Sequence, residues 1–319
     1  MPARIVVAQP IEAEIVADLA VLGPVRMNSG PDPFSAAELA RECAEAEALM
    51  AFMTERVDAA LLDACPRLRV VAGAFKGFDN VDREALRARD IAFAYVPDLL
   101  TWPTAELAVG LAIALARNMR PGDAAVRGGG FQGWRPTLYG ASLLGACVGV
   151  VGAGAVGQAI LQLLSGFPGE RLAAEPDAEA RAQAQALGAE TTSLADLAAR
   201  ADVVMLATPL TPRTLGLVDA AFLAAMRPGA LLVNLARGSV VQEAAVADAL
   251  ASGRLGGYAA DVFELEDRSR PDAPSDVHPA LLAHPRTVFT PHLGSAVVET
   301  RRAIARAAAD EILARLAAA

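Results

Sequence analysis

Short apolar runs alternate along this chain with segments of helical pattern. In the first hundred residues the apolar runs lie at 4–8, 48–52, 69–74 and 91–96. Segments of helical pattern lie at 36–47 and 83–89. Further apolar runs follow at 147–151, 171–175, 203–207, 231–234, 257–261 and 287–290. Strands that alternate with helices are typical of βαβ units around a parallel sheet. The pattern therefore predicts an α/β protein.

Two longer helices and one irregular segment complete the predicted elements. The strand at 91–96 should end at Pro97, and Thr101-Trp102-Pro103 should open a helix to about Arg117, since Thr caps and early prolines mark helix starts. An amphipathic pattern predicts the last helix at 297–316. The segment 120–139 is rich in glycine and too long for a simple turn. We interpret it as an arm or a loop that contacts a partner.

Length, composition and charge narrow the class of protein. A chain of 319 residues predicts two domains, and 54% hydrophobic residues exclude a disordered chain. The net charge of −9 argues against a surface for nucleic acid. Cys43, Cys65 and Cys147 form no CxxC pair, which indicates a reducing compartment and neither disulfides nor zinc. The uncharged stretch 136–169 contains eight glycines and Pro168, so we predict no membrane span and a cytoplasmic protein.

A glycine motif indicates a dinucleotide site. Gly152-Ala153-Gly154-Ala155-Val156-Gly157 follows a predicted strand and opens a predicted helix, as the Rossmann fingerprint requires. The first glycine permits the turn, the second lets the pyrophosphate approach, and the third permits close packing of helix on strand. The amides at the start of the helix would bind the phosphates. The alternative is a glycine-rich turn without a ligand.

Glu175 ends the next predicted strand, 18 residues after Gly157. A carboxylate there accepts hydrogen bonds from the adenosine ribose and repels a 2′-phosphate, so we predict NAD rather than NADP. The alternative is a solvated acid at the end of a strand. Residues 207–212 are expected to line the same groove.

Few side chains are available for proton chemistry. Of the 28 basic residues, 27 are arginine, and Lys76 is the one lysine. The three histidines are His278, His284 and His292. His278 and His284 precede prolines, and we expect them at the surface. His292 follows a predicted strand, at the sheet edge where α/β proteins bind ligands, and imidazole is suited to proton transfer near neutral pH.

Four ordered motifs resemble the D-isomer-specific 2-hydroxyacid dehydrogenases. They are an Arg motif at 234–238, a Glu motif at 261–266, a His motif at 290–294 and a substrate-loop motif at 73–80. The resemblance covers essentially the whole chain. It implies two Rossmann-like domains, each a parallel sheet flanked by helices, with a cleft between them. Residues 1–98 and 294–319 would form a flavodoxin-like substrate domain, and 99–293 an NAD-binding domain.

The resemblance also implies roles for individual residues. His292 would move the proton, Glu266 would orient its ring, and Arg237 would bind an oxyanion; the base stays open between His292 and Arg237. The implied substrate contacts are Met53, Lys76, Gly77, Leu100, Trp134, Tyr139, Arg237 and Ser295. The implied NAD contacts are Thr104, Gly152, Gly154, Ala155, Val156, Gly157, Glu175, Pro176, Thr208, Pro209, Leu235, Ala236, Arg237, Asp261, His292 and Gly294.

Two positions depart from the ordinary family pattern. Lys76 stands where a small or apolar residue is usual, and Asp267 stands where proline is usual. Both features, with Phe131-Gln132-Gly133-Trp134, resemble the phosphite-oxidising branch, the phosphonate dehydrogenases. A cluster of Lys76, Arg237 and a protonated His292 would suit a small dianion.

We therefore expect an NAD-dependent oxidation of phosphite to phosphate without a metal. In this reaction water attacks phosphorus as hydride leaves for NAD+. From the resemblance we further expect a homodimer that uses the segment near 120–145. One alternative is a D-2-hydroxyacid dehydrogenase or a glyoxylate/hydroxypyruvate reductase. A second alternative is an NAD-sensing binding protein similar to the corepressors that resemble this family.

Overall fold

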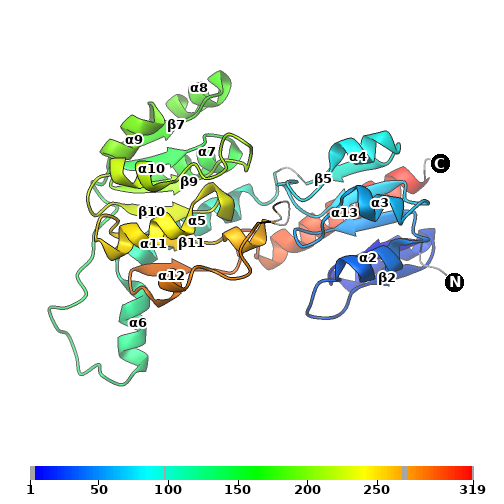
Figure 1. The fold of residues 1–319 in the computed structure, drawn as a ribbon, viewed down its shortest axis with the longest axis horizontal. Coiled ribbons are helices and arrows are strands. Elements are labelled where there is room, and N and C mark those ends of the chain that lie inside the picture. The colour runs from blue at the N-terminus through cyan, green and yellow to red at the C-terminus, as the bar shows by residue number, and fades with distance from the viewer. Residues whose placement is uncertain (1–3, 97, 268–269, 271, 318–319) are drawn as a thin grey trace. The chain divides into compact units, whose positions relative to one another are not determined.

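The chain separates into two compact units, each an α/β structure (Figure 1). The computed structural model describes residues 4–96, 98–267, 270 and 272–317, so Pro97 lies outside the described residues. The terminal unit consists of Met1–Leu100 and Ala296–Ala319, and the central unit of Thr101–Ser295. Each unit contains a parallel sheet flanked by helices, which confirms the predicted fold class.

The terminal unit is built on a five-stranded sheet over its described residues, in the order β2-β1-β3-β4-β5. This is the order of flavodoxin-like sheets. Its strands are β1 (Ile5–Val7), β2 (Val25–Met27), β3 (Ala48–Ala51), β4 (Val70–Gly73) and β5 (Ala92–Tyr95). Its helices are α1 (Ala13–Leu19), α2 (Ala36–Cys43), α3 (Ala59–Asp63), α4 (Arg83–Ala88) and α13 (Val298–Ala317). The last helix packs on β3, β4 and β5, so the C-terminal segment completes the core of the N-terminal one.

The helices after β2, β3 and β4 begin where the sequence supplies a side-chain cap. At the start of α2, Ser35 Oγ accepts from the amide of Glu38, and the Glu38 carboxylate accepts from the amide of Ser35 at 2.9 Å. Asp58 and Asp82 cap α3 and α4 in the same way, at 3.0 and 2.8 Å. These bonds satisfy amides that a helix leaves free in its first turn.

The central unit is built on a seven-stranded sheet within its described part, in the order β12-β11-β10-β9-β6-β7-β8. Its strands are β6 (Val148–Val151), β7 (Arg171–Ala174), β8 (Glu190–Thr191), β9 (Val203–Leu206), β10 (Leu231–Asn234), β11 (Gly257–Ala260) and β12 (Thr287–Phe289). The chain runs outward from β6 to β8 and then returns to β9 on the other side of β6. Ligands of open α/β sheets bind at such a switch point.

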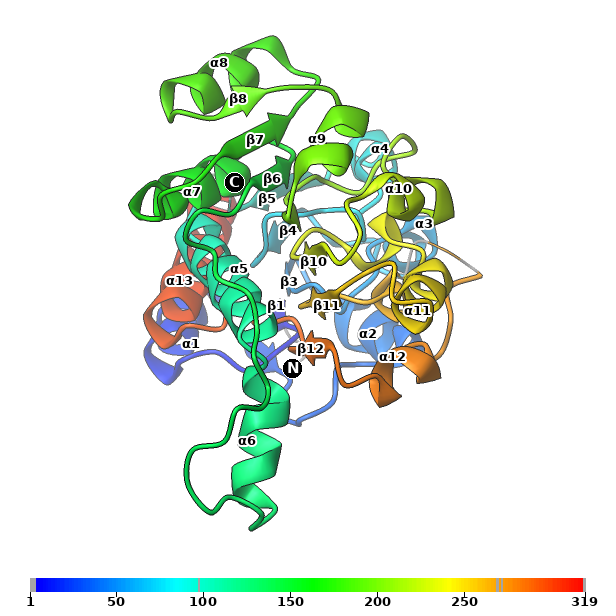
Figure 2. The same cartoon turned by 90° about the vertical axis from the view of Figure 1, so that its left-hand side faces the viewer.

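Helices cover both faces of the central sheet (Figure 2). They are α5 (Thr101–Ala116), α6 (Met119–Arg127), α7 (Ala155–Leu163), α8 (Ala178–Ala186), α9 (Leu194–Arg200), α10 (Ala220–Ala225), α11 (Glu243–Ala251) and α12 (Pro279–Ala283). Helices α5 and α7 lie on one face, and α9, α10 and α11 lie on the other. A separate apolar core fills each face, which explains the continuous apolar runs of the inner strands.

The uncharged stretch 136–169 forms parts of the central unit. It contains β6 and α7, joined by the glycine loop. In the portion of the chain that the structure describes, no helix is both long and apolar enough to cross a membrane.

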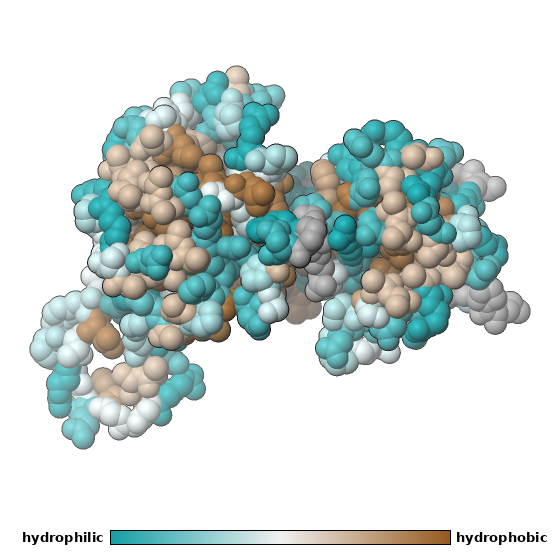
Figure 3. Space-filling model, in the orientation of Figure 1, coloured by the Kyte–Doolittle hydropathy of each residue, from teal (hydrophilic) through white to brown (hydrophobic). Residues whose placement is uncertain are grey.

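An arm, which we define as residues 119–145, projects from the central unit (Figures 1 and 2). It contains a helix, α6, where the sequence predicted an irregular segment. Asn118 separates α6 from α5 by adopting a left-handed conformation, with φ of 54°. Phe131, Trp134 and Tyr139 are 60, 76 and 73% exposed, and hydrophobic residues are visible on the arm in Figure 3. The arm thus presents aromatic side chains to solvent in this single chain.

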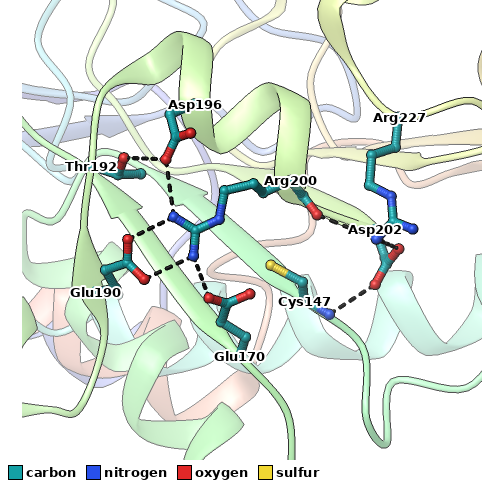
Figure 4. Close-up of polar contacts among 8 residues, drawn as sticks. All are labelled: Cys147, Glu170, Glu190, Thr192, Asp196, Arg200, Asp202 and Arg227. Carbon is teal, nitrogen blue, oxygen red and sulfur yellow. Dashed lines mark hydrogen bonds and ion pairs between the residues drawn. The ribbon is translucent and has the colours of Figure 1, made fainter.

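One arginine, Arg200, forms ion pairs at the edge of the central sheet that ends in β8 (Figure 4). Arg200, the last residue of α9, pairs with Glu190 at 2.6 Å, with Asp196 at 3.0 Å and with Glu170. Glu190 lies in β8 and Glu170 directly precedes β7. The network therefore joins the short edge strand β8 to α9 and to the start of β7.

Candidate active site

Apart from Trp134 and Tyr139 on the arm, the predicted site residues of the central unit gather at one edge of its sheet. They follow the carboxyl ends of successive strands: Gly152 after β6, Glu175 after β7, Thr208 after β9, Arg237 after β10, Glu266 after β11 and His292 after β12. Because all pairings in the described sheet are parallel, these ends share one edge. This edge includes the switch point between β6 and β9.

The glycine loop has the geometry that a dinucleotide requires. Gly152 has φ of +93°, and a Cβ there would lie 2.8 Å from the carbonyl oxygen of Ala207. A Cβ on Gly157 would lie 2.0 Å from the carbonyl oxygen of Gly152, so helix and loop touch backbone to backbone. A Cβ on Gly154, at the N-cap of α7, would meet no atom within 4 Å. The first turn of α7 therefore stays open to a phosphate group, which fits NAD.

Glu175 is held against this loop. Its Oε2 accepts from the amide of Ala153 at 2.7 Å, and its Oε1 accepts from the amide of Asp177 at 2.9 Å. Arg181 on α8 donates to the carbonyl oxygens of Glu175 and Pro176, at 3.0 and 2.6 Å. The sequence pattern did not indicate Arg181, because Pro176 and Asp177 directly follow Glu175 and the arginine comes four residues later. Because Arg181 lies one helical turn into α8, its guanidinium reaches back to the loop that contains Glu175 and Pro176.

The other predicted NAD contacts differ in exposure. Ala155, Pro176 and Pro209 are exposed, and Val156 and Thr208 are half-buried. Thr104, Leu235, Ala236, Asp261 and Gly294 are buried, as is Ser295 from the predicted substrate set. Thr104 in the first turn of α5 donates to the carbonyl oxygen of Gly294 at 3.2 Å. This bond joins the start of α5 to the end of the His292 loop.

Arg237 lies in a loop whose shape is set by Asn234. This buried last residue of β10 accepts from the amide of Ala236 through Oδ1 and donates to the carbonyl oxygen of Arg237 through Nδ2, both at 3.0 Å. A Cβ on Gly238 would lie 1.8 Å from the carbonyl carbon of Phe263. The turn η3 (Gly238–Val240) therefore packs directly on the backbone that leads to η4 (Glu264–Glu266), and it brings the Arg and Glu motifs together.

Glu266 and His292 form a close pair. His292 Nδ1 lies 2.6 Å from Glu266 Oε2, and Glu266 Oε1 accepts from the amide of Phe263 at 2.8 Å. The side chain of His292 is 26% exposed, and that of Glu266 is 33% exposed. An ionised carboxylate can only accept hydrogen bonds, so the Glu266 carboxylate favours the imidazole form that carries a proton on Nδ1. The other ring nitrogen of His292, Nε2, can then exchange a proton with a ligand.

Asp261 shapes the loop that carries His292. Its Oδ1 accepts from Thr290 Oγ1 and from the amide of Leu293, both at 2.6 Å, and its Oδ2 accepts from the amide of Gly294 at 2.8 Å. Burial raises the pKa of Asp261, and these hydrogen bonds act in the opposite direction. His292 itself adopts φ of 57°, in the left-handed region. The sequence predicted an NAD contact for Asp261; in the structure its carboxylate oxygens bind the loop.

The other two histidines flank α12. They are half-buried, not exposed as expected from the sequence, because His278 is its N-cap residue and His284 its C-cap residue. His284 Nδ1 accepts from the amide of Arg286 at 3.2 Å. The ring atom Nδ1 of His278 is buried.

The terminal unit carries four predicted substrate contacts. Lys76 and Gly77 lie in the loop after β4, Met53 follows β3, and Leu100 is the last residue of this part of the unit. All four are partly buried. Burial lowers the pKa of Lys76, and Asp98, 4.0 Å from its Nζ, acts in the opposite direction.

Arg301 on α13 was not identified from the sequence. Its guanidinium lies 5.6 Å from the centroid of the Phe52 ring and donates to the carbonyl oxygen of Ala74 at 3.5 Å. Burial lowers its pKa. The spacing to Ile304, Ala305 and Ala308 puts this arginine on the buried face of the helix, and a charge on an apolar face is the signal that could have found it.

Trp134 and Tyr139 lie on the arm, away from this edge. The arm leaves and rejoins the central unit at the amino-terminal edge of the sheet, where Arg120 donates to the carbonyl oxygen of His284, before β12. His292 lies at the carboxyl edge. Within this chain the arm therefore keeps Trp134 and Tyr139 apart from Arg237, Glu266 and His292.

Comparison with known proteins identifies the family. Residues 109–294 match the model of the D-isomer specific 2-hydroxyacid dehydrogenase, NAD binding domain. The chain is 36% identical over 282 residues to a glyoxylate reductase of Pyrococcus furiosus, covering 87% of this chain and 81% of that protein. It is 34% identical over 312 residues to the human glyoxylate reductase/hydroxypyruvate reductase, covering 96% of this chain and 92% of that protein.

A solved structure agrees over both units. The TT0316 protein from Thermus thermophilus has 34% sequence identity and a TM-score of 0.89, covering 99% of this chain and 97% of that one.

The prediction of phosphite oxidation is wrong. The two relatives are named for the reduction of glyoxylate and hydroxypyruvate, the alternative that the motifs left open. The prediction rested on Lys76, on Asp267 and on the segment 131–134. The positive charge of Lys76 suits a carboxylate as well as a phosphite dianion. The prediction of an NAD-dependent oxidoreductase is confirmed. The chain belongs to the D-isomer specific 2-hydroxyacid dehydrogenases, a family of NAD-dependent oxidoreductases.

Proposed function

We propose that this protein reduces a small 2-oxo acid, such as glyoxylate or hydroxypyruvate, to the corresponding 2-hydroxy acid with NADH, and that hydroxypyruvate gives the D isomer. The observation that carries the proposal is the Glu266–His292 pair, with 2.6 Å between carboxylate and imidazole. It lies at the same sheet edge as the glycine loop. The names of the relatives support this substrate class.

We assign the cofactor to the glycine loop and its neighbours. The open approach at Gly154 and the first turn of α7 suit the pyrophosphate, and Glu175 suits the adenosine ribose. When bound, NADH supplies the hydride that attacks the carbonyl carbon.

His292 is our candidate for the proton donor. As hydride adds to the carbonyl carbon, the carbonyl oxygen takes the proton from Nε2, so one 2-oxo acid, one NADH and one proton give the 2-hydroxy acid and NAD+. Glu266 accepts from Nδ1 and stabilises the imidazolium before transfer. We assign Arg237 to binding the substrate carboxylate or the developing oxyanion, because a guanidinium donates two parallel hydrogen bonds to such groups. Lys76 remains a candidate for a further anion contact.

Steady-state NADH oxidation tests the proposal. We expect turnover of glyoxylate or hydroxypyruvate, weaker activity with NADPH, and a loss of about 100- to 10,000-fold in kcat for His292→Asn. Lys76→Ala should raise KM for the 2-oxo acid and leave NADH binding unchanged. NADH binding without turnover of any small 2-oxo acid would instead favour an NAD-sensing binding protein.

We also propose that the arm pairs with a second copy of the chain. Its exposed aromatic residues, above all Trp134 and Tyr139, form the kind of apolar surface that marks protein contacts. Light scattering after size exclusion should give twice the chain mass of 32.9 kDa. Trp134→Ser with Tyr139→Ser should weaken the dimer, whereas the exposed Val21→Ser in the terminal unit serves as control. A monomer at micromolar concentration would refute the pairing.

A further inference from the structure

We propose that Glu243 and Glu264 are positioning residues that hold the Glu266 carboxylate against the His292 ring. The inference rests on the proposed function for its kinetic readout. Its structural basis is a set of hydrogen bonds between α11, η4 and the start of α12, all within the central unit.

The two glutamates cap each other's backbone. The amide of Glu243 donates to Glu264 Oε1 at 2.7 Å, and the amide of Glu264 donates to Glu243 Oε1 at 2.9 Å. Glu243 is the first residue of α11, and Glu264 is the first residue of η4. This reciprocal pair, which we call the brace, fixes the start of one element against the start of the other.

The brace is buried and includes a third segment. Glu243 is 4% exposed, and its second oxygen, Oε2, accepts from the amide of His278 at 2.9 Å. Both oxygens of this carboxylate therefore accept from backbone amides, and hydrogen bonds to a charged acceptor in a buried site are strong. His278, which the sequence assigned to the surface, is thus part of the support of the site.

The brace also reaches the Arg237 loop. Arg270 Nη1 lies 3.7 Å from Glu264 Oε2 and donates to Ser239 Oγ at 3.2 Å. Ser239 belongs to η3, two residues after Arg237. One carboxylate of the brace therefore links the turns that carry both the Arg and the Glu motifs.

The brace lies next to Glu266 in the chain and therefore fixes the backbone that carries Glu266. Glu266 lies two residues after Glu264 in η4, and its carboxylate spans from the amide of Phe263 to His292. Glu266 contacts His292 directly, and the charge of His292 acts to lower the pKa of Asp261. Asp261 is bound by the His292 loop itself, so loss of the brace should move Glu266 and leave Asp261 in place.

A contrast between two glutamine variants tests the inference. Glu264→Gln keeps one oxygen, which is all that the amide of Glu243 requires, and loses only the longer ion pair with Arg270, at 3.7 Å. Glu243→Gln also keeps one oxygen, but two amides require an acceptor, and its new NH2 group would face an N–H donor. Glu243→Gln should therefore disturb the brace, and Glu264→Gln should largely preserve it. Glu84→Gln, on the exposed surface of α4, is the matched control.

The readouts are kcat, KM and the pH profile. In reduction His292 must be protonated, so kcat falls as pH rises through its pKa. A displaced Glu266 stabilises the imidazolium less, and we expect the basic limb for Glu243→Gln to move to lower pH by about half a unit or more. We expect kcat to fall about 10- to 100-fold and KM for NADH to stay within about two-fold. Glu264→Ala should show the same loss of kcat and the same shift of the pH profile, whereas Glu264→Gln should stay close to the wild type in both.

An NMR titration separates the brace from the proposed reaction. The chain has three histidines, so the Hε1 signal of His292 can be assigned with His292→Asn. The imidazole pKa of folded Glu243→Gln, or of Glu264→Ala if the first variant does not fold, should lie below that of the wild type. Without turnover of 2-oxo acids the proposed function fails, but this titration still decides the brace. A wild-type imidazole pKa in these folded variants would overturn the inference, whatever their Tm.

Discussion

Gly238→Ala would separate the two turns that carry the candidate catalytic residues. The added Cβ would lie 1.8 Å from the carbonyl carbon of Phe263, 2.0 Å from its oxygen and 2.3 Å from the amide nitrogen of Glu264. All three are backbone atoms, so no side-chain rotation relieves the overlap. Because ordinary contact begins at 3.4 Å, η3 and η4 must move apart by about 1.6 Å.

This displacement acts on Arg237, which directly precedes Gly238, and on Glu266, which lies in η4. A misplacement of about 1 Å in an active site can lower the rate about 100-fold. We therefore expect kcat/KM for glyoxylate or hydroxypyruvate to fall at least about 100-fold, which corresponds to about 2.7 kcal/mol of transition-state stabilisation. Overpacking should also cost about 1–3 kcal/mol of folding free energy.

The assay combines steady-state NADH oxidation, NADH binding by fluorescence, and thermal unfolding. NADH affinity should change little, because the glycine loop follows a different strand, β6. Gly110→Ala on α5 is the control, since its Cβ would meet no atom within 4 Å. A folded Gly238→Ala with kcat/KM within about three-fold of the wild type would refute the coupling of the two turns.

Three further predictions test other parts of the structure. Gly154→Ala should leave Tm unchanged, because its Cβ meets no atom within 4 Å, and should weaken NADH binding about ten-fold or more; an unchanged Kd contradicts the assigned pyrophosphate site. Burial raises the pKa of the Cys147 thiol to about 12, so iodoacetamide at pH 8 should label it only after unfolding, and rapid labelling of the native protein contradicts this. Burial lowers the pKa of Lys76, so the unfolded chain binds more protons between that lowered pKa and the ordinary value of about 10.4, and stability should rise with pH across this window. Lys76→Met should remove that rise, and an unchanged pH slope in chemical denaturation would contradict the lowered pKa of Lys76.

The inner strands were predictable from the sequence because both faces of each sheet are covered. Strands such as β3, β6 and β10 are buried at every position and read as continuous apolar runs. The strands β2, with sequence Val-Arg-Met, and β8, with Glu-Thr, were missed because edge strands need no such run. The helix α6 was missed because its sequence contains Pro121 and Gly122 in the first turn.

The choice of substrate was beyond the sequence pattern. Lys76 and Asp267 were interpreted as a preference for phosphite, yet one cation does not distinguish a phosphite dianion from a carboxylate. The similarity to glyoxylate and hydroxypyruvate reductases over most of the chain corrected this interpretation.

The sequence by itself determined the α/β class and the glycine turn with its cofactor, because these depend on local patterns of apolar periodicity and glycine spacing. It indicated Arg237, Glu266 and His292 as site residues through the resemblance of their motifs to the family. The tertiary structure alone decided which side chains support them. Asp261 binds the loop 29–33 residues later, and Glu243 and Glu264 meet across 21 residues. The crossover connections bring the ends of parallel strands to one edge of the sheet, and residues far apart in the sequence meet there. A local sequence pattern contains no information about such contacts.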